Sequence, residues 1–249
     1  MTNSNPAQDL LNKIDSYKDV AKPRSAGNIV SIGDGVAYLS GLNDVMMTEL
    51  VEFPGGVQGL ALNLLPDSVG IVMLGEYQHL KEGDSAYASG RVLSVPVGPE
   101  FEGRVLNALC EPIDGKPAPK PAAIFPVEHI APGVITRKSV SEPVQTGIVA
   151  IDSMIPVGRG QRELIIGDRG VGKSSIAITT IINQAKENLK CIYVAIGQKR
   201  SFVAQLVATL EKYGAMEYTT VVAATASDPA AMQFLAPYAA TALGEYYAS

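Results

Sequence analysis

One run of eight residues constrains the fold of this chain more than any other feature. Residues 167–174 read Gly-Asp-Arg-Gly-Val-Gly-Lys-Ser and fit the pattern G-x-x-x-x-G-K-[ST]. Its glycines let backbone N–H groups curl around phosphate oxygens, where a Cβ would block the turn. The helix that follows directs its partial positive charge at the same anion. The pattern therefore requires a strand before it and a helix after it, and it predicts that the chain binds a nucleotide.

The same geometry predicts a role for individual residues of this phosphate-binding loop, or P-loop. Lys173 is expected to reach the β- and γ-phosphates, and the Ser174 hydroxyl is expected to ligate Mg²⁺. The expected ligands are thus ATP or ADP with Mg²⁺. The weaker alternative is a plain glycine turn between strand and helix. The predicted nucleotide-contacting residues are Gly167, Asp168, Arg169, Gly170, Val171, Gly172, Lys173, Ser174, Ser175 and Gln198.

The sequence around the loop alternates between strand and helix patterns. A buried strand is expected at 163–167, and Asp228 is expected to cap a final helix that has Pro229 at its first position. This alternation predicts a mostly parallel sheet with helices on its faces. The other expected elements are a helix at 173–188, a strand at 191–197, a helix at 201–213 and a strand at 219–224.

The first part of the chain has a different rhythm. Residues 1–24 predict a short helix and a linker, whose stripe of Leu10, Ile14 and Tyr17 either packs on the chain or docks a partner. Residues 25–95 predict a six-stranded antiparallel β-barrel, because turn signals separate short apolar runs. Residues 96–249 predict an incomplete, RecA-like P-loop α/β domain truncated at its C-terminal side, and its Pro-rich part, 96–145, predicts an extended connection. The expected strands of the barrel are 28–32, 36–39, 49–53, 59–64, 69–74 and 86–95.

Hydrolysis requires groups that this sequence does not provide in the usual places. P-loop enzymes hold Mg²⁺ with a second acid at the end of a later apolar strand. The string 148–152 ends in Asp152, but it precedes the loop and is interpreted as a chance match. Gln198 follows a strand where related catalytic ATPases have Glu, and an amide cannot accept a proton as a carboxylate does. We therefore expect nucleotide binding with poor turnover and no catalytic residue.

Composition excludes several other classes of protein. The 249 residues carry a net charge of −5, which counts against duplex binding. Cys110 and Cys191 have no partner at metal-ligand spacing, so two reduced, buried thiols are expected. No run is long and apolar enough to span a membrane, and the N-terminus resembles no secretory signal. These features favour the cytosol or an equivalent organelle interior.

Several longer runs carry a resemblance to a known family. They resemble the α-subunit family of the F-type ATP synthases over essentially the whole chain. This resemblance implies a non-catalytic nucleotide site, alternation with catalytic β subunits in a hexamer around a γ shaft, and a stator δ subunit docked on the N-terminal helix. It also implies ATP synthesis driven by an ion gradient, and a peripheral place on the cytoplasmic face of the bacterial inner membrane. The runs are 103–105, 112–115, 131–135, 143–147, 152–156, 158–169 and 193–199.

The sequence departs from this family in two ways. Gly170, Val171 and Ser174 replace the usual Gln, Thr and Thr of the loop, which keeps the Mg²⁺-ligating hydroxyl but removes one phosphate contact. The family also continues for about as many residues again. Three alternatives stay open: a catalytic ATPase of the same superfamily, a ring helicase that binds nucleic acid, and a truncated product with no independent function.

Overall fold

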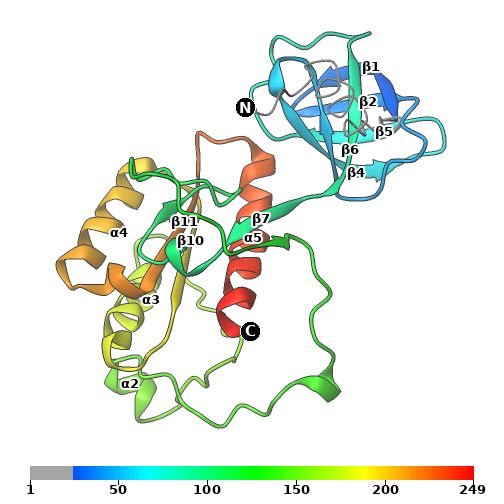
Figure 1. The fold of residues 1–249 in the computed structure, drawn as a ribbon. Helices are drawn as coiled ribbons and strands as arrows, with labels where there is room; N and C mark the ends of the chain where they lie inside the picture. The colour runs from blue at the N-terminus through cyan, green and yellow to red at the C-terminus, as the bar shows by residue number, and fades with distance from the viewer. Residues whose placement is uncertain (1–24) are drawn as a thin grey trace, which may run out of the picture.

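The structure is a computed structural model that describes residues 25–249, and it consists of a β-barrel and an α/β body joined by a strand (Figure 1). The predicted N-terminal helix and its docking lie outside the described residues. The short helical elements are η1 (Pro54–Gly56), η2 (Pro99–Phe101), η3 (Val134–Thr136), α2 (Val149–Asp152), η4 (Asn183–Lys186) and η5 (Ala215–Tyr218).

Six antiparallel strands close the barrel, in the order β1-β2-β5-β4-β3-β6. Asp34 and Gly35 connect the first hairpin with φ values of 50° and 79°, the positive pair that matches the right-handed twist of the flanking strands. Alternate side chains such as Leu39 and Ile71 fill the interior. The predicted six-stranded barrel is confirmed. Its strands are β1 (Ala26–Gly33), β2 (Val36–Ser40), β3 (Glu49–Glu52), β4 (Gln58–Leu64), β5 (Val69–Met73) and β6 (Ser85–Val92).

The single strand expected at 86–95 is wrong, because the chain changes sheets within it. β6 ends at Val92, and β7 (Ser94–Val97) pairs with β9 (Ala123–Pro126) in the α/β body. Leu93 lies between the two: its N–H donates to Thr48 in the barrel, and its carbonyl accepts from Val127 in the body. The N–H and C=O groups of Leu93 are thus hydrogen-bonded to different sides of the junction.

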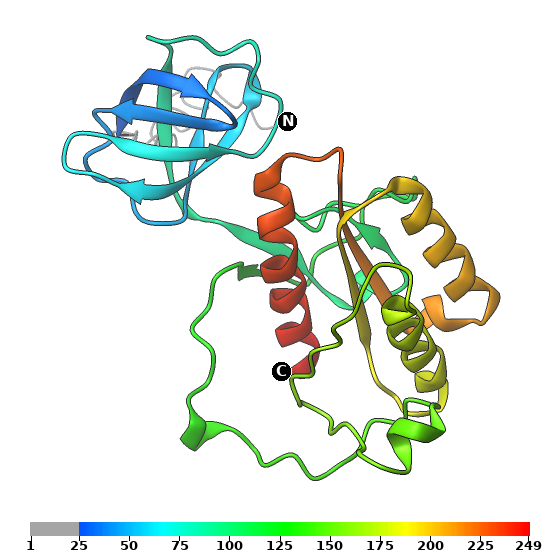
Figure 2. The ribbon, with the colours of Figure 1, turned by 180° about the vertical axis from the view of Figure 1, so that it is seen from behind.

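The α/β body is built on a parallel sheet of order β10-β11-β8, which confirms the predicted sheet type. Val221 and Ala223 of β11 pack with α3 and α4, whereas Val222 and Ala224 pack with α5. Helices therefore cover both faces of the sheet (Figure 2). The elements are β8 (Val105–Leu106), α3 (Lys173–Ile182), β10 (Cys191–Gln198), α4 (Arg200–Lys212), β11 (Thr219–Thr225) and α5 (Ala230–Ala248).

The buried strand expected at 163–167 does not form. Leu164 and Ile166 are 80% and 86% exposed, and no described strand pairs with this run. An apolar run becomes a buried strand only where neighbouring strands satisfy its N–H and C=O groups and cover its side chains. No described strand provides these partners, so the residues before the P-loop are irregular and open to solvent.

The Pro-rich segment 96–145 is only partly the extended connection that we expected. It contains the short strands β8 and β9, and the Arg104–Asp114 pair holds one of its turns together. After β9 it leaves the body as a long loop (Figure 1), in which Ile130 and Ile135 are 91% and 100% exposed.

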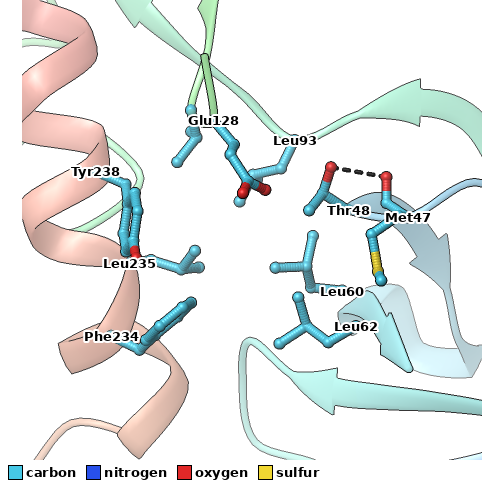
Figure 3. A pocket seen from close by; sticks show the side chains of 10 residues that line it. Met47, Thr48, Leu60, Leu62, Leu93, Glu128, Phe234, Leu235 and Tyr238 are labelled. Carbon is cyan, nitrogen blue, oxygen red and sulfur yellow. Dashed lines mark hydrogen bonds between the residues drawn. The ribbon is translucent and has the colours of Figure 1, made fainter. Parts of the chain in front are cut away.

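The barrel faces α5 across an apolar pocket of about 200 Å³ (Figure 3). Leucines of the barrel, including Leu60 and Leu62, form one wall, and Phe234 and Tyr238 of α5 form the other. Glu128 contributes the carboxylate on the polar side of this pocket. None of the predicted nucleotide-contacting residues lines it, so it is separate from the P-loop.

Candidate functional site

The P-loop leads directly into helix α3, as the motif predicts. Gly170 and Gly172 have φ values of 82° and 99°, in the left-handed region that glycine adopts without strain. A Cβ built on either residue would have no atom within 4 Å, so the loop is open on that side. Gly172 is the N-cap of α3 and provides no side-chain cap. The first N–H groups of the helix are therefore available to an anion.

The Lys173 side chain folds back over the loop. Its Nζ donates to the carbonyl oxygens of Gly167 and Asp168, at 2.5 Å each. These two bonds curl the loop around the ammonium group, which is the group expected to meet the β- and γ-phosphates. The Lys173 ammonium group thus holds the loop in its curled form.

The other predicted loop residues are placed around this curl. Ser174 is half-buried on the first turn of α3, and its hydroxyl donates no hydrogen bond within the described part of the chain, which leaves it available as a metal ligand. Ser175 follows it and is exposed. Asp168, Arg169 and Val171 are also exposed.

Gln198 is the last residue of β10, and its side chain is exposed. Helix α3 starts at the P-loop, and β10 runs back along it, so β10 ends at the same end of the sheet at which α3 begins (Figure 2). Ligands of parallel α/β sheets bind at this carboxyl end. The topology therefore brings Gln198 to the side of the sheet that carries the loop, although no hydrogen bond links its side chain to the loop residues.

Two acidic residues have roles that differ from simple sequence patterns. Asp152 ends the short helix α2 rather than a strand, which agrees with the interpretation of 148–152 as a chance match. Asp228 was expected to cap the final helix, and this is wrong. Its Oδ2 instead accepts from the N–H and the hydroxyl of Thr225, at 2.6 and 2.8 Å, while Pro229 is the N-cap of α5. Because this oxygen accepts both Thr225 donors, it does not accept the N–H groups at the start of α5.

Sequence reasoning did not find the polar cluster at the other end of α3. Asn183 and Gln184 donate to the backbone of residues 145–146, and Asp152 holds that backbone in place. The hydrogen bond from the Thr146 hydroxyl is the main cause that lowers the pKa of Asp152 below its ordinary value. No linear signature marks this cluster, because Asn183 and Thr146 are 37 residues apart.

Residues 25–249 contain no group of three or more His, Cys, Asp and Glu side chains arranged to hold a metal ion. None of their helices has the length and hydropathy to cross a bilayer.

Both parts of the fold match known domains. Residues 147–249 match the nucleotide-binding domain of the ATP synthase alpha/beta family, and residues 24–90 match the beta-barrel domain of the same family. The first range includes the P-loop and Gln198, and the second includes the barrel strands except the last two residues of β6.

Curated relatives match over almost the whole chain. ATP synthase subunit alpha of Methylobacillus flagellatus is 56% identical over 247 residues, which are 99% of this chain and 48% of the relative. The subunit of that name from Francisella tularensis subsp. holarctica is 57% identical over 96% of this chain and 46% of the relative. That of Thioalkalivibrio sulfidiphilus is 56% identical over 98% and 48%. The chain spans about half the length of the curated relatives it matches.

Proposed function

Because the chain belongs to the ATP synthase alpha/beta family, we propose that its P-loop is a non-catalytic site for ATP or ADP with Mg²⁺. One observation carries the proposal: a glycine loop curls around the Lys173 ammonium and opens onto the uncapped N-terminus of α3. Backbone N–H groups, a helix dipole and an ammonium group together fit a polyphosphate and little else.

We expect each residue of the loop to make a different contact with the nucleotide. Lys173 exchanges its two carbonyl acceptors for phosphate oxygens, and the N–H groups at the start of α3 bind the same oxygens. The Ser174 hydroxyl is the chain's ligand for Mg²⁺, which neutralises phosphate charge when it is bound. The replacement of Gln by Gly170 leaves phosphate contacts mainly to the backbone, as its open surroundings indicate.

The neutral Gln198 is the reason to propose a site without catalysis. An amide at the end of β10 can orient water but cannot remove its proton, so the rate of hydrolysis stays low.

We further propose that the whole protein is an α subunit, which alternates with β subunits around a γ shaft, contacts δ, and takes part in ion-driven ATP synthesis at a membrane. Exposed apolar side chains such as Leu164, Ile166 and Phe234 support this proposal, since such surfaces often lie at subunit contacts.

The test is binding of a fluorescent ATP analogue to the 249-residue chain with Mg²⁺, together with phosphate release. We expect wild type to bind with negligible release, Lys173→Ala to abolish binding, and Gln198→Ala to change it little. Lys212→Ala is the control, because Lys212 lies at the far end of α4 and its loss removes the same charge. Equal binding by wild type and Lys173→Ala would refute the site. Phosphate release that depends on Lys173 would favour the catalytic alternative.

A further inference from the structure

We propose that Asp152 is a positioning residue for the phosphate-binding helix α3, acting through the segment 145–152, which we name the strap. The strap holds the end of α3 opposite the P-loop, and so fixes the direction in which the helix N-terminus points. This inference rests on the proposed nucleotide function and adds to it a residue that does not touch the ligand.

The Asp152 carboxylate folds the strap into a tight turn. Its Oδ1 accepts from the N–H and the hydroxyl of Thr146, at 3.1 and 2.6 Å, and its Oδ2 accepts from the N–H of Gly147 at 2.9 Å. The Thr146 hydroxyl also accepts from the N–H of Ile148. Thr146 is 4% exposed, so its hydroxyl and N–H have little water with which to replace these bonds.

Two amide side chains then join the strap to the end of α3. Asn183 Nδ2 donates to Thr179 O of the helix at 2.8 Å and to Thr146 O of the strap at 3.2 Å. Gln184 Nε2 donates to Thr180 O and to Gln145 O, both at 2.7 Å. Each amide thus bridges one carbonyl in the last turn of the helix and one strap carbonyl.

Close packing leaves this junction no freedom to slide. Gly147 has a φ of 73°, and a Cβ built on it would lie 2.2 Å from Asn183 Nδ2. Gln184 is only 3% exposed. The strap backbone therefore rests directly on the amide that it binds, and release of the turn would remove both amide bridges from the end of the helix.

The ten residues of α3 make it a lever about 15 Å long. A tilt of about 10° at the strap would move the helix N-terminus by about 2–3 Å, whereas hydrogen bonds to phosphate tolerate a few tenths of an ångström. The strand expected before the loop is absent here. Within the described residues, the strap shares the polar anchoring of this end of α3 with the Tyr218 hydroxyl, which donates to the carbonyls of Ile181 and Ile182 at 3.0 and 3.1 Å. We infer that phosphate affinity depends on the strap.

The test compares Asp152→Asn with Asp84→Asn in the 249-residue chain. Asp84 also accepts a backbone N–H in a turn, from Lys81 at 2.8 Å, but it lies in the barrel. The readout is the Kd for Mg-free pyrophosphate, a probe of the loop alone, measured by calorimetry where circular dichroism shows that both variants are folded. We expect about tenfold weaker binding for Asp152→Asn, of the size of a helix-terminus contribution, and no change for Asp84→Asn.

A second pair of variants separates positioning from a general loss of stability. Thr146→Val keeps the shape of the side chain but removes the hydroxyl that donates to Asp152, whereas Thr146→Ser keeps the hydroxyl. We expect the Thr146→Val variant to bind pyrophosphate more weakly than wild type, and the Thr146→Ser variant to bind it as wild type does. This difference should hold even if both substitutions lower the melting temperature equally.

The outcomes distinguish this inference from the proposed function. Wild-type affinity in Asp152→Asn, with Lys173→Ala still unable to bind, would overturn the positioning role and leave the nucleotide site standing. Equal losses for Asp84→Asn and Asp152→Asn would also overturn it, since they would indicate a stability effect alone. Absence of binding by wild type would refute the proposed function, and the positioning role with it.

Discussion

The turn held by Arg104 and Asp114 allows a prediction that can be worked through from the structure. Arg104 donates Nε to Asp114 Oδ2 at 2.6 Å and Nη2 to Oδ1 at 2.8 Å, a bidentate ion pair. The carboxylate also accepts the N–H groups of Val105 and Lys116. The two side chains are only 11% and 9% exposed, so water does not replace these contacts. Asp114→Asn removes the charge but keeps the shape.

The expected loss in the free energy of unfolding is about 3 kcal/mol at pH 7. Removing one partner of a buried pair costs about 3–5 kcal/mol, because it leaves an uncompensated charge. The low end applies, since Arg104 Nη2 still donates to the carbonyls of Lys116 and Pro117, at 3.3 and 2.9 Å. Asp67→Asn, at an exposed turn of the barrel, is the control and should change stability by less than about 0.5 kcal/mol.

The effect should also depend on pH with a definite sign. The Arg104 hydrogen bonds hold the pKa of Asp114 well below its usual range. A lowered pKa in the folded state contributes stability above the unfolded pKa of about 3.9, and this contribution is lost as the pH falls through the folded pKa. The difference between wild type and Asp114→Asn should therefore be constant from pH 7 to 5 and shrink below about pH 4. Urea unfolding followed by circular dichroism measures it. A difference under about 1 kcal/mol at pH 7, or one that stays constant to pH 3, would refute this reasoning.

Two further predictions concern packing and reactivity. Gly59→Ala should destabilise the barrel by about 1–3 kcal/mol, because its Cβ would lie 2.4 Å from Ile71 Cγ2. Gly33→Ala is the control and should be nearly neutral, since a Cβ there would meet open space. Thermal melts of both variants measure the difference. Cys110 is buried and Cys191 is half-buried, and this burial raises their pKa values to about 12 and about 11. A thiol reagent at pH 8 should therefore label neither quickly until guanidinium unfolds the chain. Rapid labelling of Cys110 in the folded chain would contradict its burial.

Local chemistry predicts much of this fold. The sequence predicts the first five barrel strands to within two residues of their observed ends, because residues such as Asp34 and Gly35 signal a turn without help from distant parts of the chain. The sequence also predicts α4 and β11 closely, since their apolar patterns match the faces that they bury. The curl of the P-loop follows from its motif for the same reason, since it depends on its own glycines and on the helix it starts.

Most of the errors share a physical cause, which is dependence on a partner far away in sequence. The run 163–167 has a strand's composition but no strand beside it, and β8 has only two residues, which become a strand because β11 pairs with them. The Asp228 error has a different cause, because two local arrangements compete for its carboxylate: the helix cap that we expected, and the two hydrogen bonds that Thr225, three residues before it, donates. The role of Asp152 was equally hidden, because Asn183 and Gln184 reach the strap only after the chain has folded.

The pairing of β8 with β11 has a consequence for the order in which the chain folds. Thr220 in β11 donates to the carbonyl of Phe101, which precedes it by 119 residues. Closing so long a loop costs more entropy than closing the hairpins of the barrel, and proteins are synthesised from the N-terminus. The barrel can therefore form while the ribosome is still adding the residues of α4. The sheet of the α/β body has to wait until β11 has emerged, and until then its apolar strands are unpaired and exposed to water.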